Sequence, residues 1–335
     1  MIFSAGIFMS QKNFGSNFYY LNHQFLYGFL PGLFLFLAAL KIDYKIWKKI
    51  SLPLILISLG FLVLIFLPNF GITVSGAKRW LNFFDLFSFQ PSEVLKLILI
   101  IYLASWLKQL DKVGSVIAFL VILSLIGFLV AAQPDIGTLG IIVGIALVMF
   151  FISGGEMKHF LSIALLIAIG FSLLIIFEPY RFNRIFTFIN PDFDVKGISY
   201  HLNQSLIAIG KGGIFGLGFG KGEQKLGLLP EPVGDSIFGV IGEELGFVGM
   251  TFTIGLFLLF IITCFNASKK TKDKFLSLYA VGLSSWVGIQ AFTNIASLTG
   301  LIPLTGVPLP FISYGGTSLV MLMAGVGILV NMSKK

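Results

Sequence analysis

Residues 236–265 read SIFGVIGEELGFVGMTFTIGLFLLFIITCF and carry only two charged residues, Glu243 and Glu244, in 30 positions. About 20 mostly apolar residues suffice for a helix to cross a membrane. Further stretches of the same apolar character occur at residues 26–41, 51–68, 93–107, 115–132, 137–153, 159–178, 274–298 and 315–332. Residues 1–9, MIFSAGIFM, resemble the end of one more span. The sequence therefore predicts an all-α polytopic membrane protein with a single integral membrane domain, 1–335.

The composition supports this class of protein. Hydrophobic residues make up 56% of the 335 residues and charged residues 11%, against roughly 25% charged in a soluble protein. The mean hydropathy is +0.96. These values exclude soluble and disordered proteins, and no nucleic-acid partner is expected although the net charge is +8. The one cysteine, Cys264, cannot form an internal disulfide, and no cleaved signal peptide or metal motif is expected.

The distribution of lysines predicts the orientation. With a cytoplasmic C-terminus, the short cytoplasmic segments hold 13 of the 23 Lys and Arg residues, as the positive-inside rule requires. These are Lys41, Lys45, Lys48, Lys49, Lys108, Lys112, Lys158, Lys269, Lys270, Lys272, Lys274, Lys334 and Lys335. Two long segments, 69–92 and 179–235, then lie on the outer face. Because the second contains apolar stretches such as IFGLGFG, we expect it to be ordered and packed on the membrane face.

Basic residues in and after the first outer segment are candidates for binding an anion. Lys78 and Arg79 lie outside, against the positive-inside bias. They either bind a phosphate or diphosphate at the membrane surface or reach towards lipid headgroups. Glu93 and Lys96 are three residues apart at the start of a span. They either form a local ion pair or extend the cationic site, and the two interpretations are compatible.

Two arginines open the second outer segment. Arg181 and Arg184 have i, i+3 spacing, which makes them neighbours on a helix. They either pair with Asp192 or Asp194 or contact a phosphate, and the sequence leaves both possibilities open.

Carboxylates at the ends of spans are the candidates for catalysis. Asp135 and Asp235 each precede a span, where an Asp either caps the helix or acts directly in chemistry. For Asp235 the chemical role would be that of a general base facing an outer cavity, with Glu231 as its partner. Glu243 and Glu244 lie about two turns deeper and indicate a polar interior around that helix.

The segment 301–318, LIPLTGVPLPFISYGGTS, contains three prolines and three glycines and cannot form a regular helix. Irregular backbone at membrane depth is tolerated where it is buried in protein or lines a cavity. The sequence therefore predicts that this segment walls a cavity. Ser313 and Tyr314 would either bind a polar ligand or satisfy the freed backbone groups.

Five motifs occur in order: GAKRWLNFFDLFSFQPSEVLK, QPDIGT, GLGFGKGEQKLGLLPE, GDSIFGVIGEELGFVG and PLTGVPLPFISYGGTS. With them the chain resembles, over nearly its whole length, the SEDS family of FtsW/RodA-type proteins, and slightly more the division type. The resemblance implies a ten-helix bundle with a large outer loop between the seventh and eighth helices. It implies a peptidoglycan glycosyltransferase of the cytoplasmic membrane that polymerises lipid II on the outer face. The implied partner is a class B penicillin-binding protein, a transpeptidase, together with other divisome or elongasome proteins.

The resemblance also assigns residues. The proposed catalytic Asp of the family falls on Asp235, where Gly234 and Ser236 depart from the commoner Thr and Phe. Its polar and cationic first-loop residues fall on Lys78, Arg79, Gln90, Glu93 and Lys96, and its Gln-Pro-Asp motif on Gln133, Pro134 and Asp135. The stretch SAGIFMS resembles only the outer end of the family's first helix, so a truncated first span is expected.

The implied reaction transfers a glycan from its polyprenyl diphosphate to the 4-hydroxyl of an incoming lipid II, with inversion at the anomeric carbon. Asp235 would act as the base, and Lys78, Arg79 and Lys96 would neutralise the leaving diphosphate. A divalent cation, Mg²⁺ or Mn²⁺, could share that work. The alternatives are a lipid II flippase and a non-catalytic scaffold. The gathering of unusual charges at the outer face favours chemistry there over a flippase.

Overall fold

The computed structural model describes residues 1–74, 76–83, 87–107, 113–176, 179–190, 197 and 199–333. The chain forms two compact units. Unit 1 comprises Met1–Phe29, Phe171–Leu259 and Gln290–Gly316, and unit 2 comprises Leu30–Gly170, Phe260–Ile289 and Thr317–Lys335. Three long helices pass from one unit into the other: α9 (Met157–Ile176), α12 (Ile237–Lys270) and α13 (Lys274–Leu298).

The apolar stretches coincide with helices, as predicted. Helical segments long and apolar enough to cross a membrane are Tyr19–Lys41, Tyr44–Leu64, Met157–Ile176, Ile237–Lys270 and Lys274–Leu298. Shorter apolar helices cover Val116–Ala131, Ile136–Ile152 and Gly316–Met332. The prediction of a helical, multi-pass membrane protein is therefore confirmed.

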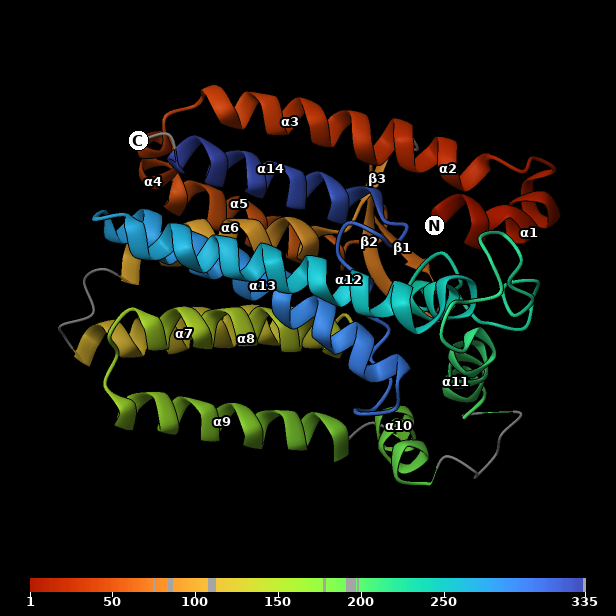
Figure 1. Ribbon diagram of the computed structural model, residues 1–335. Helices are drawn as coiled ribbons and strands as arrows, with labels where there is room; N and C mark the ends of the chain where they lie inside the picture. The colour runs from red at the N-terminus through yellow and green to blue at the C-terminus, as the bar shows by residue number, and fades with distance from the viewer. Residues whose placement is uncertain are drawn as a thin grey trace. The chain divides into compact units, whose positions relative to one another are not determined.

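Unit 2 is built around α6 (Pro91–Trp106), which is buried along nearly its whole length. Pro91 opens this helix at a position where a missing N–H costs nothing. The residues that follow are apolar on every side, which is the pattern of a helix surrounded by protein. The helices packed on it include α4 (Tyr44–Lys49), α5 (Ser51–Leu64), α7 (Val113–Ala131), α8 (Ile136–Ile152) and α14 (Gly316–Ser333), and α3 (Leu30–Lys41) lies beside α14 (Figure 1).

Glycines let α3 and α14 pack closely along their length (Figure 1). A Cβ atom on Gly327 would lie 2.7 Å from the carbonyl oxygen of Phe36, and one on Gly32 would lie 2.7 Å from the sulfur of Met323. At the far end of the pair, the Asn331 side chain donates a hydrogen bond to the carbonyl of Leu40 at 2.6 Å. Small residues at such contacts are typical of helices that pack in a membrane.

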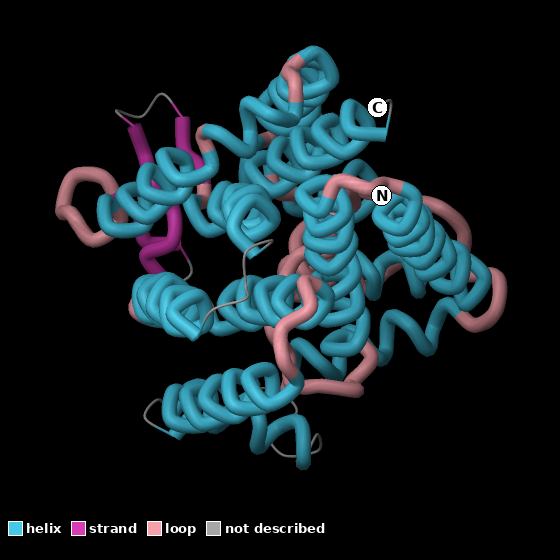
Figure 2. Tube along the Cα trace, turned by 90° about the vertical axis from the view of Figure 1, so that its left-hand side faces the viewer, coloured by secondary structure: helices cyan, strands magenta, loops and turns pink. Residues whose placement is uncertain are grey.

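The first outer segment adds a small sheet to the helical fold. Strands β1 (Gly71–Val74), β2 (Ala77–Phe83) and β3 (Phe87–Phe89) form an antiparallel sheet in the order β1-β2-β3. Figure 2 shows the three strands together beside helices. The sheet holds Lys78 and Arg79 on its central strand, so their side chains are placed by backbone pairing and not by a flexible loop.

Unit 1 contains the second outer segment. Its helices are α1 (Ile2–Phe14), α2 (Tyr19–Gln24), the π-helix η1 (Phe25–Phe29), α10 (Pro179–Ile189) and α11 (Tyr200–Gly212), together with the first part of α12 and the end of α13. The irregular segment 301–315 follows α13 and contains no helix or strand, as its prolines and glycines predict.

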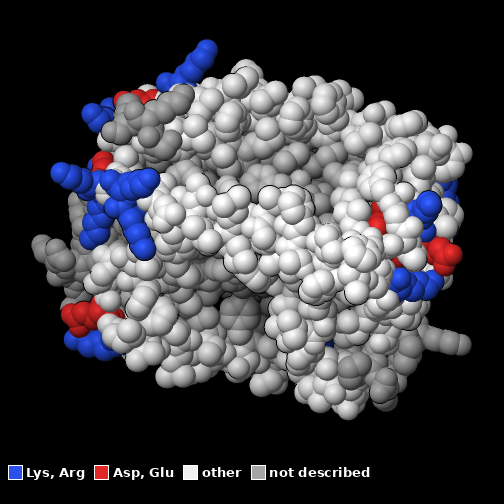
Figure 3. Space-filling view, viewed as in Figure 1, with Lys and Arg blue, Asp and Glu red and all other residues white. Residues whose placement is uncertain are grey.

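Exposed lysines gather at one end of unit 2. They lie at the end of α3, on α4, at the end of α12 and at the start of α13, on the left of Figure 3. The hydroxyl of Tyr44 donates to the Asp273 carboxylate at 3.1 Å, which ties α4 to the turn between α12 and α13. Lysine clusters that are far apart in the sequence therefore meet at one end of this unit, as a cytoplasmic assignment of these segments requires.

The predicted span 236–265 is interrupted, because α12 breaks at Gly246, where φ is 65° and ψ is −163°. A glycine-rich turn, residues 213–220, forms hydrogen bonds with the backbone on both sides of the break. The N–H groups of Leu217 and Gly218 donate to the carbonyls of Glu243 and Glu244 at 2.9 and 3.0 Å. Beyond the break, the N–H groups of Phe247 and Val248 donate to the carbonyls of residues 213 and 214 at 2.9 and 3.1 Å. The backbone groups that the break leaves unpaired are thus satisfied by another segment.

Candidate functional site

Asp235 lies on a tight turn in unit 1, immediately before α12. The turn is closed by Glu231, whose φ is 43° and whose carbonyl accepts from the N–H groups of Gly234 and Ser236 at 3.0 and 3.3 Å. Pro230 and Pro232 flank Glu231 and prevent the chain from continuing as a helix. The sequence predicted Glu231 as the partner of Asp235, and the structure places both carboxylates on this one turn.

Asn294, on α13, fixes the backbone of the catalytic candidate. Its side-chain amide donates both to the carbonyl of Asp235 and to the carbonyl of Val307, each at 2.7 Å. The residue is almost completely buried. One side chain therefore joins the Asp235 turn to the Pro- and Gly-rich segment 301–315. Sequence reasoning missed Asn294, because an isolated Asn in an apolar helix gives no indication of its partners.

Ser313 supports the same turn from the other side. Its hydroxyl donates to the carbonyl of Gly234 at 2.6 Å and accepts from the N–H of Leu309 at 2.8 Å, while the N–H of Tyr314 donates to the carbonyl of Val233 at 2.8 Å. Ser313 was a candidate for substrate binding, with backbone satisfaction as the alternative. In the structure the hydroxyl performs the backbone role, and the segment 301–315 packs on the Asp235 turn as a wall.

Asp235 is half-buried, and its Oδ1 atom is shielded from solvent with no hydrogen-bond partner among the residues that the structure describes. Burial first, and the neighbouring carboxylate of Glu231 second, raise the pKa of Asp235 from 3.8 to about 7. Local backbone N–H groups and the guanidinium of Arg184 oppose these effects without cancelling them. A carboxyl group of this kind changes charge near neutral pH, as a general base should.

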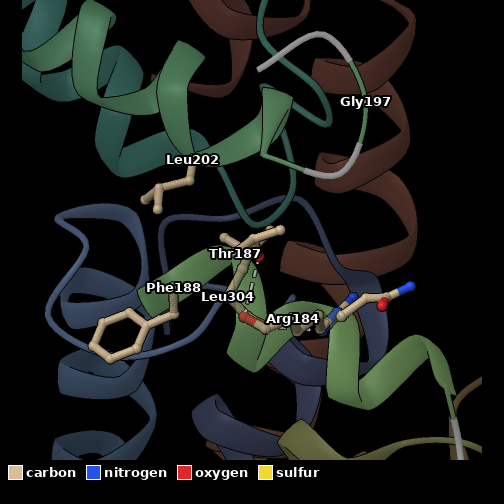
Figure 4. A pocket seen from close by; sticks show the side chains of 7 residues that line it. Arg184, Thr187, Phe188, Gly197, Leu202 and Leu304 are labelled. Atoms are coloured by element: carbon tan, nitrogen blue, oxygen red, sulfur yellow. Dashed lines mark hydrogen bonds between the residues drawn. The ribbon is translucent and has the colours of Figure 1, made fainter. Parts of the chain in front are cut away.

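Arg184, on α10, stands beside a cavity of about 360 Å³ in unit 1. Its guanidinium donates to the carbonyl of Leu304 at 2.9 Å. Figure 4 shows the side chains of α10 facing Leu202 of α11 and Leu304 across this cavity. The lining residues are Asn183, Arg184, Thr187, Phe188, Gly197, Leu202 and Leu304. A largely apolar cavity with one guanidinium suits a ligand that has both an apolar and an anionic part.

His201, on α11, is a second residue that sequence reasoning missed. Its Nε2 atom lies 2.5 Å from the hydroxyl of Ser236, and that hydroxyl donates to the carbonyl of Pro230 at 2.6 Å. Because the Ser236 proton is used on Pro230, His201 must donate from Nε2, which fixes its tautomer. Burial, and then the charge of Arg184, lowers the pKa of His201 to about 4, so the ring is neutral. Ser236 thereby links α11 to Pro230, at the start of the turn that carries Glu231 and Asp235.

In unit 2, Lys96 and Glu93 form a buried ion pair with 2.7 Å between Nζ and Oε1. The Lys96 ammonium also lies 5.1 Å from the ring centre of Trp286, on α13. The local ion pair that the i, i+3 spacing predicted is therefore present, and its cation is also held against an aromatic face.

Arg79, Gln90 and Asp135 come together in unit 2. The Arg79 guanidinium donates to the carbonyls of Gln133, at 3.3 Å, and of Pro134, and it lies 3.8 Å from Asp135 Oδ1. The Gln90 side chain donates to Asp135 Oδ2 at 3.3 Å. Asp135 also accepts from the N–H of Thr138 at 3.3 Å and so caps α8, as the helix-cap interpretation predicted. Two motifs that are more than 40 residues apart thus form one polar cluster.

The two deeper glutamates hold the glycine-rich turn. Glu243 accepts from the N–H groups of Glu223 and Gln224 at 2.8 and 3.1 Å, and Glu244 accepts from the N–H of Gly220 at 3.1 Å. Both glutamates are completely buried. The polar surroundings that Glu243 and Glu244 indicated in the sequence are therefore the backbone N–H groups of this glycine-rich segment, which face the two carboxylates.

The N-terminal helix α1 is attached to this cluster. The buried ammonium of Lys225 lies 2.5 Å from Glu244 Oε1 and donates to the hydroxyl of Ser4 at 2.7 Å and to the carbonyl of Gly220 at 2.9 Å. Ser4, in turn, donates to Glu244 at 2.6 Å. The short first helix is thus joined to the glycine-rich turn by a buried cation and its counter-ion.

Three further predictions concern Lys78, Arg181 and the divalent cation. Lys78 donates to the carbonyl of Leu67 at 3.2 Å and lies at the surface of the sheet. The side chain of Arg181, and all of Asp192 and Asp194, lie outside the described residues. Within the described part of the chain, no three His, Cys, Asp or Glu side chains are grouped so that they could hold a metal ion. Among the described side chains there is therefore no grouping that fits a resident divalent cation.

The chain is similar to known proteins over its whole length. The family model described as cell cycle protein, which covers FtsW, RodA and SpoVE, matches residues 1–335. A probable peptidoglycan glycosyltransferase FtsW from Geobacter sp. (strain M18) is 37% identical over 340 residues, covering 100% of this chain and 92% of the relative. Stage V sporulation protein E from Bacillus subtilis (strain 168) is 36% identical over 340 residues with the same coverage.

Solved structures share the fold. The rod shape determining protein RodA of Thermus thermophilus has a TM-score of 0.67 at 25% identity, covering 91% of this chain and 84% of that one. A chain of a peptidoglycan synthase complex, solved to show how polymerization and crosslinking are coordinated, has a TM-score of 0.80 at 24% identity. That match covers 99% of this chain and 94% of the other.

Proposed function

The chain belongs to the FtsW, RodA and SpoVE family of cell cycle proteins and is a peptidoglycan glycosyltransferase of cell division or cell shape, and on this premise we propose that it polymerises lipid II with Asp235 as the general base. The observation that carries the proposal is the state of Asp235. It is half-buried, its shielded Oδ1 atom has no partner among the described residues, and its pKa is about 7. The backbone that carries it is fixed by Asn294 and Ser313.

In the proposed reaction, the 4-hydroxyl oxygen of the acceptor GlcNAc attacks the anomeric carbon of the polyprenyl-diphosphate-linked glycan. Asp235 takes the hydroxyl proton as the new carbon–oxygen bond forms. The bond from the anomeric carbon to the diphosphate breaks, and polyprenyl diphosphate leaves with the electron pair. A single in-line displacement inverts the α-linked donor to a β-1,4 product. General base catalysis of this kind typically contributes about 10²–10⁴-fold to the rate.

The remaining candidate residues bind the charged parts of the substrates. Lys78, Arg79 and Lys96 would neutralise the leaving diphosphate, because developing negative charge is stabilised best by cations that are already in place. Gln90, Glu93 and Asp135 would orient these cations through the contacts described above. The Arg184 cavity, with its apolar lining, would take an anionic group of the substrate and the chain attached to it, and Arg181 is the second candidate on that helix.

The topology and the partner are further parts of the proposal. We place the lysine-rich end of unit 2 and the C-terminus in the cytoplasm and the Asp235 turn on the outer face of the bacterial inner membrane. The expected partner is a class B penicillin-binding protein, because a polymerised strand must then be crosslinked. A divalent cation would be held through substrate oxygens, since the described side chains form no metal site.

The test is polymerisation of labelled lipid II by the purified protein, alone and with its cognate transpeptidase. Wild type should make glycan chains, and Asp235→Asn should lose them while it keeps its fold and its binding to the partner. Asp43→Asn is the matched control, because Asp43 caps α4 through the N–H of Lys45 and Asn caps equally well. Folded wild-type protein that makes no chains in the presence of its partner, but moves lipid II across a liposome membrane, would overturn the proposal in favour of a flippase.

A further inference from the structure

The glycine-rich turn after α11 presents four exposed apolar side chains, here named the apolar tip: Ile214, Phe215, Leu217 and Phe219. Phe215 is 82% exposed and Ile214 64%. The tip lies in the second outer segment and not in one of the predicted spans. Contiguous exposed apolar side chains of this kind mark a surface that interacts with something other than water.

The backbone under the apolar tip is fixed, so the tip cannot fold back to hide its side chains. The turn is hydrogen-bonded on both sides of the break in α12, at residues 243–244 and 247–248. Gly216 makes the approach possible, because a Cβ atom there would lie 2.2 Å from the carbonyl oxygen of Glu244. Its φ of 80° is also one that other residues rarely adopt.

The apolar tip continues an exposed apolar stripe on α12. Phe247 and Val248, whose N–H groups bind the turn, are themselves more than half exposed. The stripe continues at about one-turn intervals and comprises Phe247, Val248, Phe252, Leu256 and Leu259. On a helix that crosses a membrane such a stripe faces lipid, because the lipid tails are as apolar as the side chains.

The length of α12 places the tip at the edge of the hydrocarbon core. From Phe247 to Ser268 the helix extends about 33 Å at 1.5 Å per residue, against about 30 Å for the core. The exposed Lys269 and Lys270 mark the aqueous boundary at one end. Phe247, and with it the tip, then lies at the opposite boundary. The exposed Lys221 follows directly after the tip.

We propose that the apolar tip is a membrane wedge that inserts into the leaflet opposite the Lys269 end, at the level where acyl chains meet headgroups. Lys221 binds lipid phosphate beside it. The occupant of this surface is lipid, because the tip is continuous with the lipid-facing stripe of α12 and ends in a cation. The wedge anchors the glycine-rich turn, and through it the broken start of α12, at a fixed depth. Insertion depends only on the membrane location of α12, and only the test of anchoring by activity rests on the proposed function.

The test uses a fluorescent probe in vesicles of phosphatidylcholine and phosphatidylglycerol. Cys264 is the only cysteine, so Phe215→Cys in a Cys264→Ser background takes one environment-sensitive label. The matched control is Glu223→Cys in the same background, because the Glu223 side chain is 70% exposed and carries a charge in the same segment. The label at 215 should emit at shorter wavelength than the label at 223. Insertion by roughly 5–10 Å predicts stronger quenching by lipids brominated near the headgroup than by lipids brominated at the chain end.

Emission from position 215 that matches position 223, with no quenching by either lipid, overturns the proposal. So does a label that becomes shielded only when the transpeptidase is added, since the occupant would then be protein. A second variant tests the anchoring. The double variant Phe215→Ser, Phe219→Ser should lower polymerisation in vesicles. It should not do so in detergent micelles, because detergent adapts to the wild-type and the variant surface alike. An equal loss in both media would mean that the two rings act within the folded protein and would also overturn the wedge.

Discussion

Replacing Glu231 with Gln should shift the pH dependence of polymerisation towards acid. Asp235 must be ionised to accept a proton, so activity should rise with pH through a midpoint near 7, the pKa of its carboxyl group. Burial is the main cause of that raised value, and the charge of Glu231 is the second. Gln keeps the size and polarity of the side chain but removes its charge. The remaining desolvation should still hold the pKa of Asp235 well above 3.8.

The size of the shift follows from these two causes. A neighbouring opposite charge changes a carboxyl pKa by about 1–3. We take an effect of similar size and opposite sign for Glu231, at the lower end because burial contributes more than Glu231 does. A midpoint that moves by about one pH unit changes the ionised fraction at pH 6 from about one tenth to about one half. Glu231→Gln should therefore be up to about fivefold faster than wild type at pH 6. Above pH 8 its rate should be equal or lower, since a weaker base accepts the proton less readily.

The assay is the initial rate of lipid II polymerisation between pH 5 and 9 at saturating substrate. Glu223→Gln is the control, because Glu223 pairs with Lys211 at 3.1 Å, is largely exposed and should leave the midpoint in place. An unchanged midpoint in Glu231→Gln, or a midpoint that moves towards alkali, would refute the electrostatic coupling. A wild-type profile that is flat from pH 5 to 8 would refute the raised pKa of Asp235 itself.

Three further predictions concern the framework around the site. His201→Phe should lower the polymerisation rate about tenfold, which is the effect of losing one hydrogen bond. His201→Gln keeps a donor near the position of Nε2 and should recover most of that rate. A loss of rate that Gln does not relieve would contradict the hydrogen-bonding role. Lys225→Met should destabilise the protein by about 3–5 kcal/mol in thermal unfolding, because it leaves Glu244 buried without its counter-ion, and changing Glu244 to Met as well should restore most of the loss. Gly216→Ala should prevent stable folding, whereas Gly140→Ala, where a Cβ atom would meet nothing within 4 Å, should be tolerated; equal melting temperatures would refute the close backbone approach.

Much of the fold could be predicted from the sequence, because the apolar stretches are long enough to span a membrane. In lipid, a spanning segment must satisfy its own backbone hydrogen bonds, which favours a helix. The irregular segment 301–315 followed from its prolines in the same way. Asp235 and Glu231 could be singled out because charge near a span is rare. The small sheet was missed, although residues 71–83 alternate in polarity around a Ser-Gly pair, since the surrounding spans dominated the interpretation.

The missed site residues are those whose role depends on contacts that the local sequence does not record. Asn294 is one polar residue in an apolar helix, and its partners at 235 and 307 are 59 and 13 residues away. His201 meets Ser236 across 35 residues. The break at Gly246 was missed for a different reason, because glycine is common within membrane helices and only the neighbouring turn reveals that the helix is interrupted there.

The central claim is that the Asp235 carboxylate takes the proton of the acceptor hydroxyl, and single-turnover joining of two lipid II molecules tests it most directly. At pH 8, with both substrates bound, Asp235→Asn should be slower than wild type by about 10²–10⁴-fold while lipid II affinity changes little. A folded Asp235→Asn protein that joins the two molecules within threefold of the rate of wild type would contradict the claim and require another base.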